Sequence, residues 1–291
     1  IANPNEIVKV AMVGKYIDIG NYTLKDSYVS VNEALIHAGA ENGVKVEIEW
    51  VDAKKLEKED SKILLKKYAG IIVPGGFGSS GVEGKINAIK YARENNIPYL
   101  GLCYGMQLAV VEYARNVVGL KGANTTENDK KTPYPVIDII EAQKKILEKG
   151  DYGGTMRLGA YAAKLDKNTK VYNLYKGTNR LKKDKERIDE LKKDKDQAFR
   201  LGKTEGEEII LERHRHRYEV NPDFISRIKE KGLVFSGHHI RKDDTKLMEF
   251  IELSNHKFFI ATQAHPEFKS ALGKPAPLFN GFVKAVIDKD K

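Results

Sequence analysis

Runs of apolar, often β-branched residues alternate with amphipathic stretches along the first half of the chain. Four runs predict buried strands, at residues 7–13, 44–51, 70–73 and 97–102. The stretches between and after them place apolar side chains at the three- and four-residue spacing of a helix, most clearly at 28–38, 85–95 and 106–118. Strands that alternate with helices in this way form a parallel sheet covered by helices.

The second half of the chain shows a different pattern. Its strand-like runs are short and look more antiparallel and irregular, at 155–162, 170–174, 208–213, 233–235, 247–253 and 258–262. A last amphipathic helix is predicted over 277–288, after Pro275, with Leu278, Phe282 and Val286 on one side. The whole pattern predicts an α/β fold with a mostly parallel central sheet and an additional antiparallel segment.

We expect one domain that spans residues 1–291, and two segments within it differ from the rest. Residues 176–207 form a charged insertion, in which a narrow apolar stripe predicts a solvated helix between two strands, or less simply an element that docks a partner. Residues 1–6 contain Asn3-Pro4-Asn5 and read as the remnant of a linker. Because the chain begins with Ile1 rather than Met, we expect a missing N-terminal portion.

Composition narrows the possible environments. The 50 Lys and Arg residues outnumber the 41 Asp and Glu residues, but the two signs are interspersed, as on a solvated surface. No apolar run is long enough to span a bilayer and no signal-peptide pattern opens the chain, so a cytoplasmic protein is expected. The single cysteine, Cys103, cannot form an internal disulfide and is either a buried small residue or a reactive thiol.

The segment Gly101-Leu102-Cys103-Tyr104-Gly105 lies between an apolar strand and an apolar helix. It has the G-x-nucleophile-x-G pattern of a nucleophile elbow, with cysteine in the place of serine. A strand that turns abruptly into a helix leaves no room for side chains next to the nucleophile, which explains the two glycines. The N-terminus of the following helix favours the thiolate, which is the nucleophilic form.

A histidine and a carboxylate follow a later strand, in Gln263-Ala264-His265-Pro266-Glu267. Such a histidine can accept a thiol proton while the carboxylate fixes its tautomer. Alone, either Cys103 or His265 would more simply be structural. Together they predict a cysteine-dependent hydrolase.

A third glycine-rich segment, Pro74-Gly75-Gly76-Phe77-Gly78, ends another buried strand. Glycines there let backbone N–H groups approach a substrate, and the Gly76 amide could join the Tyr104 amide in an oxyanion hole. Similar segments cradle phosphates in other α/β folds, but this one lacks the Lys-Ser/Thr pair of a phosphate-binding loop.

The run Arg213-His214-Arg215-His216-Arg217 has the composition of a nucleic-acid-binding patch. It continues an apolar strand, so alternate side chains face opposite sides of the sheet and only part of the charge can line one surface. We therefore predict no nucleic-acid partner. The other histidines lack ligand-like companions, so no metal site is expected and they are interpreted as structural or surface residues: His37, His238, His239 and His256.

Taken together, these motifs resemble class I glutamine amidotransferases, a flavodoxin-like family whose triad is Cys, His and Glu in that chain order. More narrowly, the chain is similar to the C-terminal glutaminase domain of the CTP synthase family. The segments that carry the narrower resemblance are VGKY at 13–16, YVSVNEAL at 28–35, PGGFG at 74–78, ARENNIPY at 92–99, GANTTE at 122–127, GGTMRLG at 153–159 and ERHRHRYEVN at 212–221.

The resemblance implies roles for individual residues. The nucleophile, the general base and acid, and the group that orients it would be Cys103, His265 and Glu267, in that order. The oxyanion amides would come from Gly76 and Tyr104. The amino-acid end of glutamine would be held by Gln107, Glu127 and Arg217, in keeping with the preference of an α-ammonium for a carboxylate and of an α-carboxylate for donors.

The resemblance also implies partners that these residues do not contain. L-glutamine would be the substrate, and the ammonia would pass to an N-terminal synthase domain of the same polypeptide, which aminates UTP to CTP. No cofactor is expected in this domain; ATP, UTP, Mg and GTP are expected only with the full-length enzyme, which would be a homotetramer. No membrane partner is expected.

One loop departs from the family pattern. The family usually has an arginine in the loop after PGGFG, where this chain has Gly78-Ser79-Ser80-Gly81. In the family the loop is a lid linked to activation by GTP. Serine cannot replace a bidentate anion-binding guanidinium, so we expect GTP stimulation to be weakened or to use another residue.

Two alternatives remain at this stage. Another cysteine hydrolase of the same fold, such as a γ-glutamyl peptidase or a protease, would not require the three residues proposed to hold a free amino acid. An inactive regulatory domain would be expected to have a broken triad, whereas Cys103, His265 and Glu267 are all present.

Overall fold

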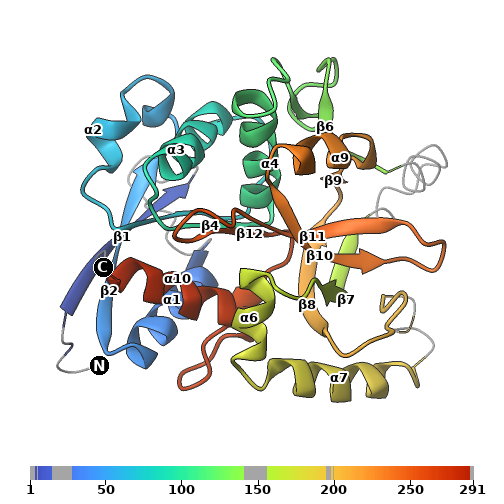
Figure 1. Cartoon of the computed structure of the whole chain (residues 1–291). Helices are drawn as coiled ribbons and strands as arrows, with labels where there is room; N and C mark the ends of the chain where they lie inside the picture. The colour runs from blue at the N-terminus through green and yellow to red at the C-terminus, as the bar shows by residue number, and fades with distance from the viewer. Residues whose placement is uncertain are drawn as a thin grey trace.

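A central nine-stranded sheet organises the molecule (Figure 1). The computed structural model describes residues 4, 6–14, 28–140, 156–194, 198 and 200–288. Across the sheet the strand order is β2-β1-β3-β4-β12-β11-β10-β7-β8. The first five strands run parallel and the remainder antiparallel, so both predicted strand arrangements occur within one continuous sheet.

The parallel half confirms the four strands predicted from the first half of the chain. These are β1 (Glu6–Gly14), β2 (Val44–Asp52), β3 (Gly70–Val73) and β4 (Tyr99–Leu102). The strand β1 begins at Glu6, within the segment that was interpreted as a linker. Strands β3 and β4 are buried along their whole length, because helices cover both faces of a parallel sheet.

The strand β12 (Phe259–Thr262) joins the two halves of the sheet. It pairs parallel with β4 on one side and antiparallel with β11 on the other. The antiparallel half consists of β11 (Lys246–Glu252), β10 (Val234–Ile240), β7 (Arg157–Leu165) and β8 (Ile209–His216). The ends of β4 and β12 therefore lie side by side, which brings the residues that follow them together.

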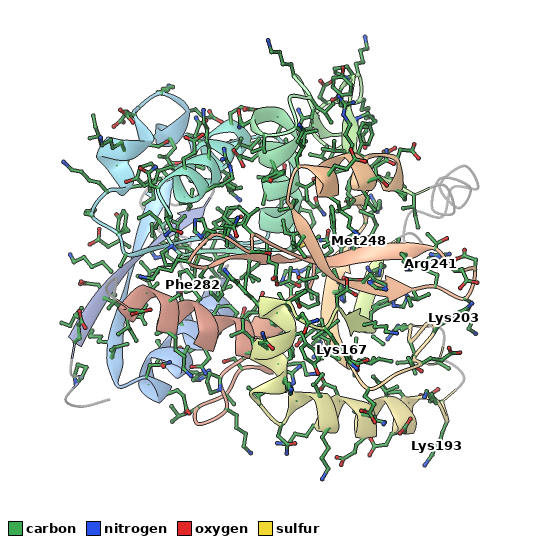
Figure 2. All side chains as sticks on the ribbon, in the orientation of Figure 1. Lys167, Lys193, Lys203, Arg241, Met248 and Phe282 are labelled. Carbon is green, nitrogen blue, oxygen red and sulfur yellow. The ribbon has the colours of Figure 1, made fainter. Side chains whose placement is uncertain are left out.

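Helices cover both faces of the parallel half (Figure 1). On one face α1 (Val29–Glu41) and α10 (Pro277–Ile287) pack on Val10 and Met12 of β1. On the other, α3 (Val82–Glu94) and α4 (Tyr104–Asn116) pack over Ala11 and Val13. Figure 2 shows Phe282 of α10 between the helix and the sheet, as the predicted apolar stripe requires.

Smaller elements complete the fold. A short 3-10 helix, η2 (Lys55–Glu57), and α2 (Ser61–Leu65) precede β3. A second, three-stranded sheet contains β5 (Asn124–Thr125), β6 (Pro135–Asp138) and β9 (Glu219–Val220), and α9 (Pro222–Glu230) follows it. Residue 155 of the strand predicted at 155–162, and residues 153–155 of the segment GGTMRLG, lie outside the described residues.

The strand predicted at 170–174 was wrong, because this segment forms the helix α6 (Lys170–Lys176). Thr169 caps it by accepting a hydrogen bond from the Tyr172 N–H. The carboxylate of Glu252 accepts the first N–H groups, from Lys170 at 2.8 Å and Val171 at 2.9 Å. These caps satisfy the helix start, and Val171 and Tyr175 are buried one turn apart, so local packing outweighs the β propensity of the segment.

The charged segment 176–207 contains the helix α7 (Arg180–Leu191), which comes between β7 and β8 in the chain, as predicted. Its apolar stripe is not fully solvated. Ile188 is buried against Ile209 and Leu211 of β8. Asp184, on the same side, is also buried. The helix is therefore packed on the outermost strand of the sheet, where its Arg180 also pairs with the buried Glu212 of β8 at 2.6 Å.

Candidate active site

Cys103 lies at a sharp turn between β4 and α4 and has φ 50° and ψ −102°. A positive φ is uncommon for a residue with a side chain and costs conformational energy that the surrounding structure must offset. The Cys103 N–H donates to the Thr262 carbonyl at 2.7 Å, and the Cys103 carbonyl accepts from Met106 N at 3.0 Å and Gln107 N at 3.2 Å. Hydrogen bonds from the sheet and the helix thus hold the turn on both sides.

The two flanking glycines are required by space. A Cβ added to Gly105 would lie 2.1 Å from the Val73 carbonyl oxygen. A Cβ added to Gly101 would lie 2.6 Å from the Tyr99 hydroxyl oxygen and 2.7 Å from the Ala261 Cβ. The steric argument made from the motif is therefore confirmed, since no side chain fits at either position without a shift of the backbone.

His265 follows β12 and faces the same end of the sheet as Cys103. The backbone N–H of His265 donates to the Arg213 carbonyl of β8 at 2.8 Å. Its Nδ1 lies 2.7 Å from Glu267 Oε1, in the 3-10 helix η4 (Pro266–Lys269). Because the carboxylate occupies Nδ1, the other ring nitrogen is the one available to the thiol.

Cys103 and His265 both lie next to Gly75, close to the position that a Cβ of this residue would occupy. A Cβ built on Gly75 would be 3.2 Å from His265 Cε1 and 3.6 Å from Cys103 Cβ. Burial lowers the pKa of His265, but its hydrogen bonds with Cys103 and Glu267 outweigh that effect and raise the pKa to about 10. The site therefore favours an imidazolium next to the sulfur, which is the arrangement that stabilises a thiolate.

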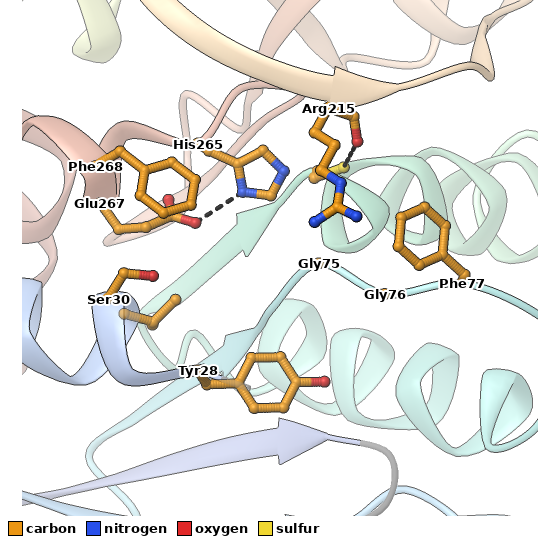
Figure 3. A pocket seen from close by; sticks show the side chains of 11 residues that line it. Tyr28, Ser30, Gly75, Gly76, Phe77, Arg215, His265, Glu267 and Phe268 are labelled. Atoms are coloured by element: carbon orange, nitrogen blue, oxygen red, sulfur yellow. Dashed lines mark hydrogen bonds and ion pairs between the residues drawn. The ribbon is translucent and has the colours of Figure 1, made fainter. Parts of the chain in front are cut away.

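A cavity of about 550 Å³ opens at the sulfur (Figure 3). Its described lining consists of Tyr28, Ser30, Val31, Gly75, Gly76, Phe77, Cys103, Arg215, His265, Glu267 and Phe268. Figure 3 shows the Arg215 guanidinium close to Gly75 and Gly76, between His265 and Phe77. The cavity thus combines a nucleophile, a cation and apolar walls, which suits a small molecule with an anionic group.

The two residues predicted to supply oxyanion amides lie close together. Gly76 lines the cavity, and a Cβ there would be 4.0 Å from the Tyr104 ring. Asn128 donates to the Tyr104 hydroxyl at 2.7 Å, and this hydroxyl lies 3.3 Å from the Gly78 carbonyl, to which it can donate. These contacts fix the glycine-rich loop against the start of α4.

The three residues predicted to hold the amino-acid end of glutamine are not among the described residues that line the cavity. Gln107 is buried beneath the turn, and its Nε2 donates to the Tyr218 carbonyl and to Gln263 Oε1, both at 3.1 Å. Glu127 accepts from the Gly78 N–H at 2.8 Å, which places its carboxylate against the glycine-rich loop. Arg217 follows β8, which ends at His216.

Sequence reasoning missed two residues near the sulfur. The Arg215 side chain lines the cavity, and its backbone carbonyl lies 3.9 Å from Cys103 Sγ. Gln263, quoted within the histidine motif but given no role, places Nε2 at 3.6 Å from Cys103 Sγ. The alternation of β8 could have indicated Arg215, whereas no sequence signal identified Gln263.

The side chains of the arginine-histidine run alternate between two faces, as predicted, and its histidines are buried. His214 and His216 point into the protein while Arg213 and Arg215 are exposed. Burial, followed by the charge of Arg157, holds the pKa of His214 well below its usual value. The histidines of the run therefore belong to a buried group of polar side chains, and the run does not form a continuous cationic surface.

Arg157 is the centre of that group. It pairs with Glu249 at 2.6 Å and with Glu219 at 3.2 Å, and Glu219 also contacts His216 Nε2 at 2.9 Å. Burial raises the pKa of Glu249 to about 7. For Glu219, burial acts in the same direction, but His216 and Arg157 outweigh it and lower the pKa. Two buried carboxylates thus share one guanidinium beneath the strand that contacts both Cys103 and His265.

In the described part of the chain, no group of three or more His, Cys, Asp or Glu residues is arranged to hold a metal ion. A helix that could cross a bilayer is also absent from those residues, because their helices are too short or too polar.

Relatives were found by sequence and by structure. A family model described as glutamine amidotransferase class-I matches residues 23–285. The CTP synthase of Methanocaldococcus jannaschii is 50% identical over 291 residues, which cover 98% of this chain and 46% of the relative. The CTP synthase of Pyrococcus abyssi is 50% identical over 96% of this chain and 44% of its own length. The chain thus spans about half the length of these relatives.

A solved structure of similar extent matches the whole fold. The glutaminase domain of Trypanosoma brucei CTPS with bound acivicin superposes with a TM-score of 0.79 at 33% sequence identity, over 98% of this chain and 95% of that domain. This relative and the family model agree with the fold described above. The chain therefore belongs to the class I glutamine amidotransferases and, within them, to the glutaminase domains of the CTP synthases.

Proposed function

We propose that this chain is the glutaminase half of a CTP synthase, which hydrolyses the side-chain amide of glutamine and supplies ammonia. The observation that carries the proposal is that Cys103 and His265 lie together next to Gly75 and line the same cavity, with Glu267 on the other nitrogen of the imidazole. This arrangement meets the geometric requirement for an activated cysteine nucleophile.

The first half-reaction forms a thioester. The Cys103 thiolate attacks the amide carbon of glutamine, and negative charge collects on the carbonyl oxygen, where the backbone amides of Gly76 and Tyr104 would stabilise it. The imidazolium of His265 then donates its proton to the amide nitrogen. The carbon–nitrogen bond breaks, ammonia leaves, and a γ-glutamyl thioester remains on Cys103.

The second half-reaction restores the enzyme. His265, now neutral, accepts a proton from a water molecule as the water oxygen attacks the thioester carbon. The carbon–sulfur bond breaks, glutamate leaves, and the proton held by His265 again stabilises the thiolate. Glu267 stays ionised throughout and keeps the imidazole in the required tautomer.

Binding of the amino-acid end of glutamine is assigned to one carboxylate and one guanidinium. Glu127 would pair with the α-ammonium group. Arg215, whose guanidinium lines the cavity, is a second candidate beside Arg217 for the α-carboxylate. Gln107 could contribute only through its Oε1, because its Nε2 is already engaged with Tyr218 and Gln263.

The remaining steps belong to a longer protein. A synthase domain of the same polypeptide would use the ammonia to aminate UTP with ATP and Mg, in a homotetramer that GTP regulates. The names and lengths of the relatives support this partner. A peptidase-like or inactive domain is less well supported, because the relatives are CTP synthases and because Cys103, His265 and Glu267 line one cavity, with Glu267 bonded to His265.

Release of ammonia and glutamate from glutamine tests the proposal. The purified chain, alone and mixed with the synthase domain of a relative, should form glutamate and ammonia in equal amounts. Cys103→Ala should abolish both products, whereas Ser254→Ala, a change remote from the cavity, should leave them unchanged. Equal rates for the chain and for Cys103→Ala would refute the proposal.

A further inference from the structure

We propose that Gln263 is a further catalytic residue, which donates a hydrogen bond to the sulfur of Cys103 and stabilises its anionic form. Gln263 Nε2 lies 3.6 Å from Cys103 Sγ. The Gln263 residue is fully buried, and its backbone N–H donates to the Glu249 carbonyl at 2.9 Å. The backbone of Gln263 is therefore held by β11, and its side-chain amide contacts the sulfur that reacts.

The direction of the bond follows from the groups around it. The carbonyl oxygen of Tyr218 can only accept, so Gln107 must present its NH2 group there, at 3.1 Å. The second hydrogen of that NH2 group points to Gln263 Oε1, also at 3.1 Å. Once its oxygen is occupied in this way, Gln263 must turn its own NH2 group toward Cys103.

This bond discriminates between the two forms of the nucleophile. A neutral thiol is a weak acceptor, whereas a thiolate accepts a charge-assisted hydrogen bond that is roughly twice as strong as a neutral one. The Arg215 carbonyl, 3.9 Å from the sulfur, has the opposite preference, because it can accept from S–H but repels an anion. Gln263 therefore offsets an unfavourable contact of the thiolate and complements the imidazolium of His265 from another side.

Gln107 acquires a positioning role in this arrangement. Its two donors connect the Tyr218 carbonyl to the Gln263 oxygen, so it fixes the rotation of the Gln263 amide without touching the sulfur. Loss of Gln107 should leave Gln263 in place but free its amide to turn its oxygen toward the thiolate.

The inference rests on the proposed function, because it assigns a residue to the same nucleophile. Its test uses the single cysteine of the chain, so that alkylation by iodoacetamide, followed by mass, reports Cys103 alone. The quantity to compare is the ratio of the alkylation rate at about pH 7 to that at about pH 10, where any cysteine is mostly thiolate.

Wild-type chain should give a higher ratio than the Gln263 variants, because the Gln263 amide stabilises the thiolate form. We expect Gln263→Met, which removes the donor but fills the same space, to lower the ratio about tenfold. Gln263→Glu should lower it further, because a carboxylate repels the thiolate, and Gln107→Met should lower it less than Gln263→Met. Thermal unfolding of each variant separates these effects from a loss of stability.

The outcomes separate the inference from the function beneath it. An unchanged ratio in Gln263→Met and Gln263→Glu, with or without a fall in Tm, would overturn the inference and leave the function standing. A wild-type ratio as low as that of an unfolded, urea-treated sample would overturn both. If Gln263→Met does not fold, the alkylation ratios of Gln263→Glu and Gln107→Met test the inference in its place.

Discussion

Glu267 Oε1 lies 2.7 Å from His265 Nδ1, and only Pro266 separates the two residues in the chain. This carboxylate, after the contact with Cys103, is a main reason that the pKa of His265 is raised to about 10 in spite of burial. We predict that Glu267→Gln lowers the pKa of His265 and lowers kcat about a hundredfold or more, since the imidazole loses its orienting charge.

The same substitution should change how stability depends on pH. A histidine whose folded pKa is raised contributes stability that is fully present below its usual pKa, 6.5, and is lost as pH rises toward about 10. In Glu267→Gln this loss should be complete at a lower pH. Urea unfolding across this range and NMR titration of His265 measure both effects, with His256, bonded to the Ala92 carbonyl, as an internal control. An unchanged His265 titration would contradict the role of Glu267.

Gly105 and Gly76 make a matched pair for the steric claim about the turn. A Cβ at Gly105 would meet the Val73 carbonyl oxygen at 2.1 Å, whereas at Gly76 the nearest atom is the end of the flexible Lys85 side chain, at 3.5 Å. Gly105→Ala should therefore destabilise the chain by about 3 kcal/mol or more. Gly76→Ala, which keeps its backbone N–H, should remain within about 0.5 kcal/mol of wild type. Similar urea midpoints for the two variants would be inconsistent with this account.

The parallel half of the fold and the positions of Cys103 and His265 after neighbouring strands could be predicted from sequence for physical reasons. Buried strands of a parallel sheet read as continuous apolar runs, and turn residues at their ends mark where functional groups emerge. The failure at 170–174 has an equally physical cause. The helix α6 is stabilised by Glu252, a carboxylate far away in sequence that accepts hydrogen bonds from its first N–H groups. Such a distant partner does not contribute to the secondary-structure propensity of residues 170–174.

The site was predicted less completely than the fold. Cys103, His265 and Glu267 belong to recognisable motifs, so their proximity could be expected. Gln263 and Arg215 contact the sulfur through the packing of β12 and β8 around the turn, a relationship between strands that no local pattern encodes. Arg215 and Arg217 occupy equivalent alternate positions in the sequence. Only Arg215 belongs to β8, because the strand ends at His216.

The position of the Arg215 guanidinium in the cavity leads to a prediction about substrate binding. If Arg215 holds the α-carboxylate, Arg215→Gln should raise the KM for glutamine about tenfold with a smaller change in kcat, while Cys103 alkylation by iodoacetamide stays unchanged. Arg217→Gln provides the comparison. A KM that rises only in Arg217→Gln would reject Arg215 and favour the assignment made from the family resemblance. Steady-state kinetics of both variants decide between them.

Asp184 ties the charged segment to the turn that carries Glu267. Its carboxylate accepts from Lys269 Nζ at 2.8 Å and from the Leu211 N–H at 3.0 Å, and it is buried. We predict that Asp184→Asn costs about 2 kcal/mol of unfolding free energy, because the Leu211 N–H and the partly buried cations of Lys269 and Arg180 lose an ionised acceptor.

Asp189, on the same helix, is the control for this prediction. It is exposed and pairs only with Lys192 among the contacts of its side chain given by the structure. Asp189→Asn should change the unfolding free energy by less than about 0.5 kcal/mol. Equal costs for the two variants, measured by urea denaturation, would mean that α7 is not anchored through Asp184.

The central claim is that Cys103 is held as a nucleophile by His265 in a cavity shaped for glutamine. Treatment with acivicin, the compound bound in the Trypanosoma brucei relative, followed by mass spectrometry, tests it most directly. We predict one adduct on Cys103 that excess glutamine prevents, and no adduct in Cys103→Ala. Modification at another residue, or none even in the presence of a synthase domain, would contradict the account.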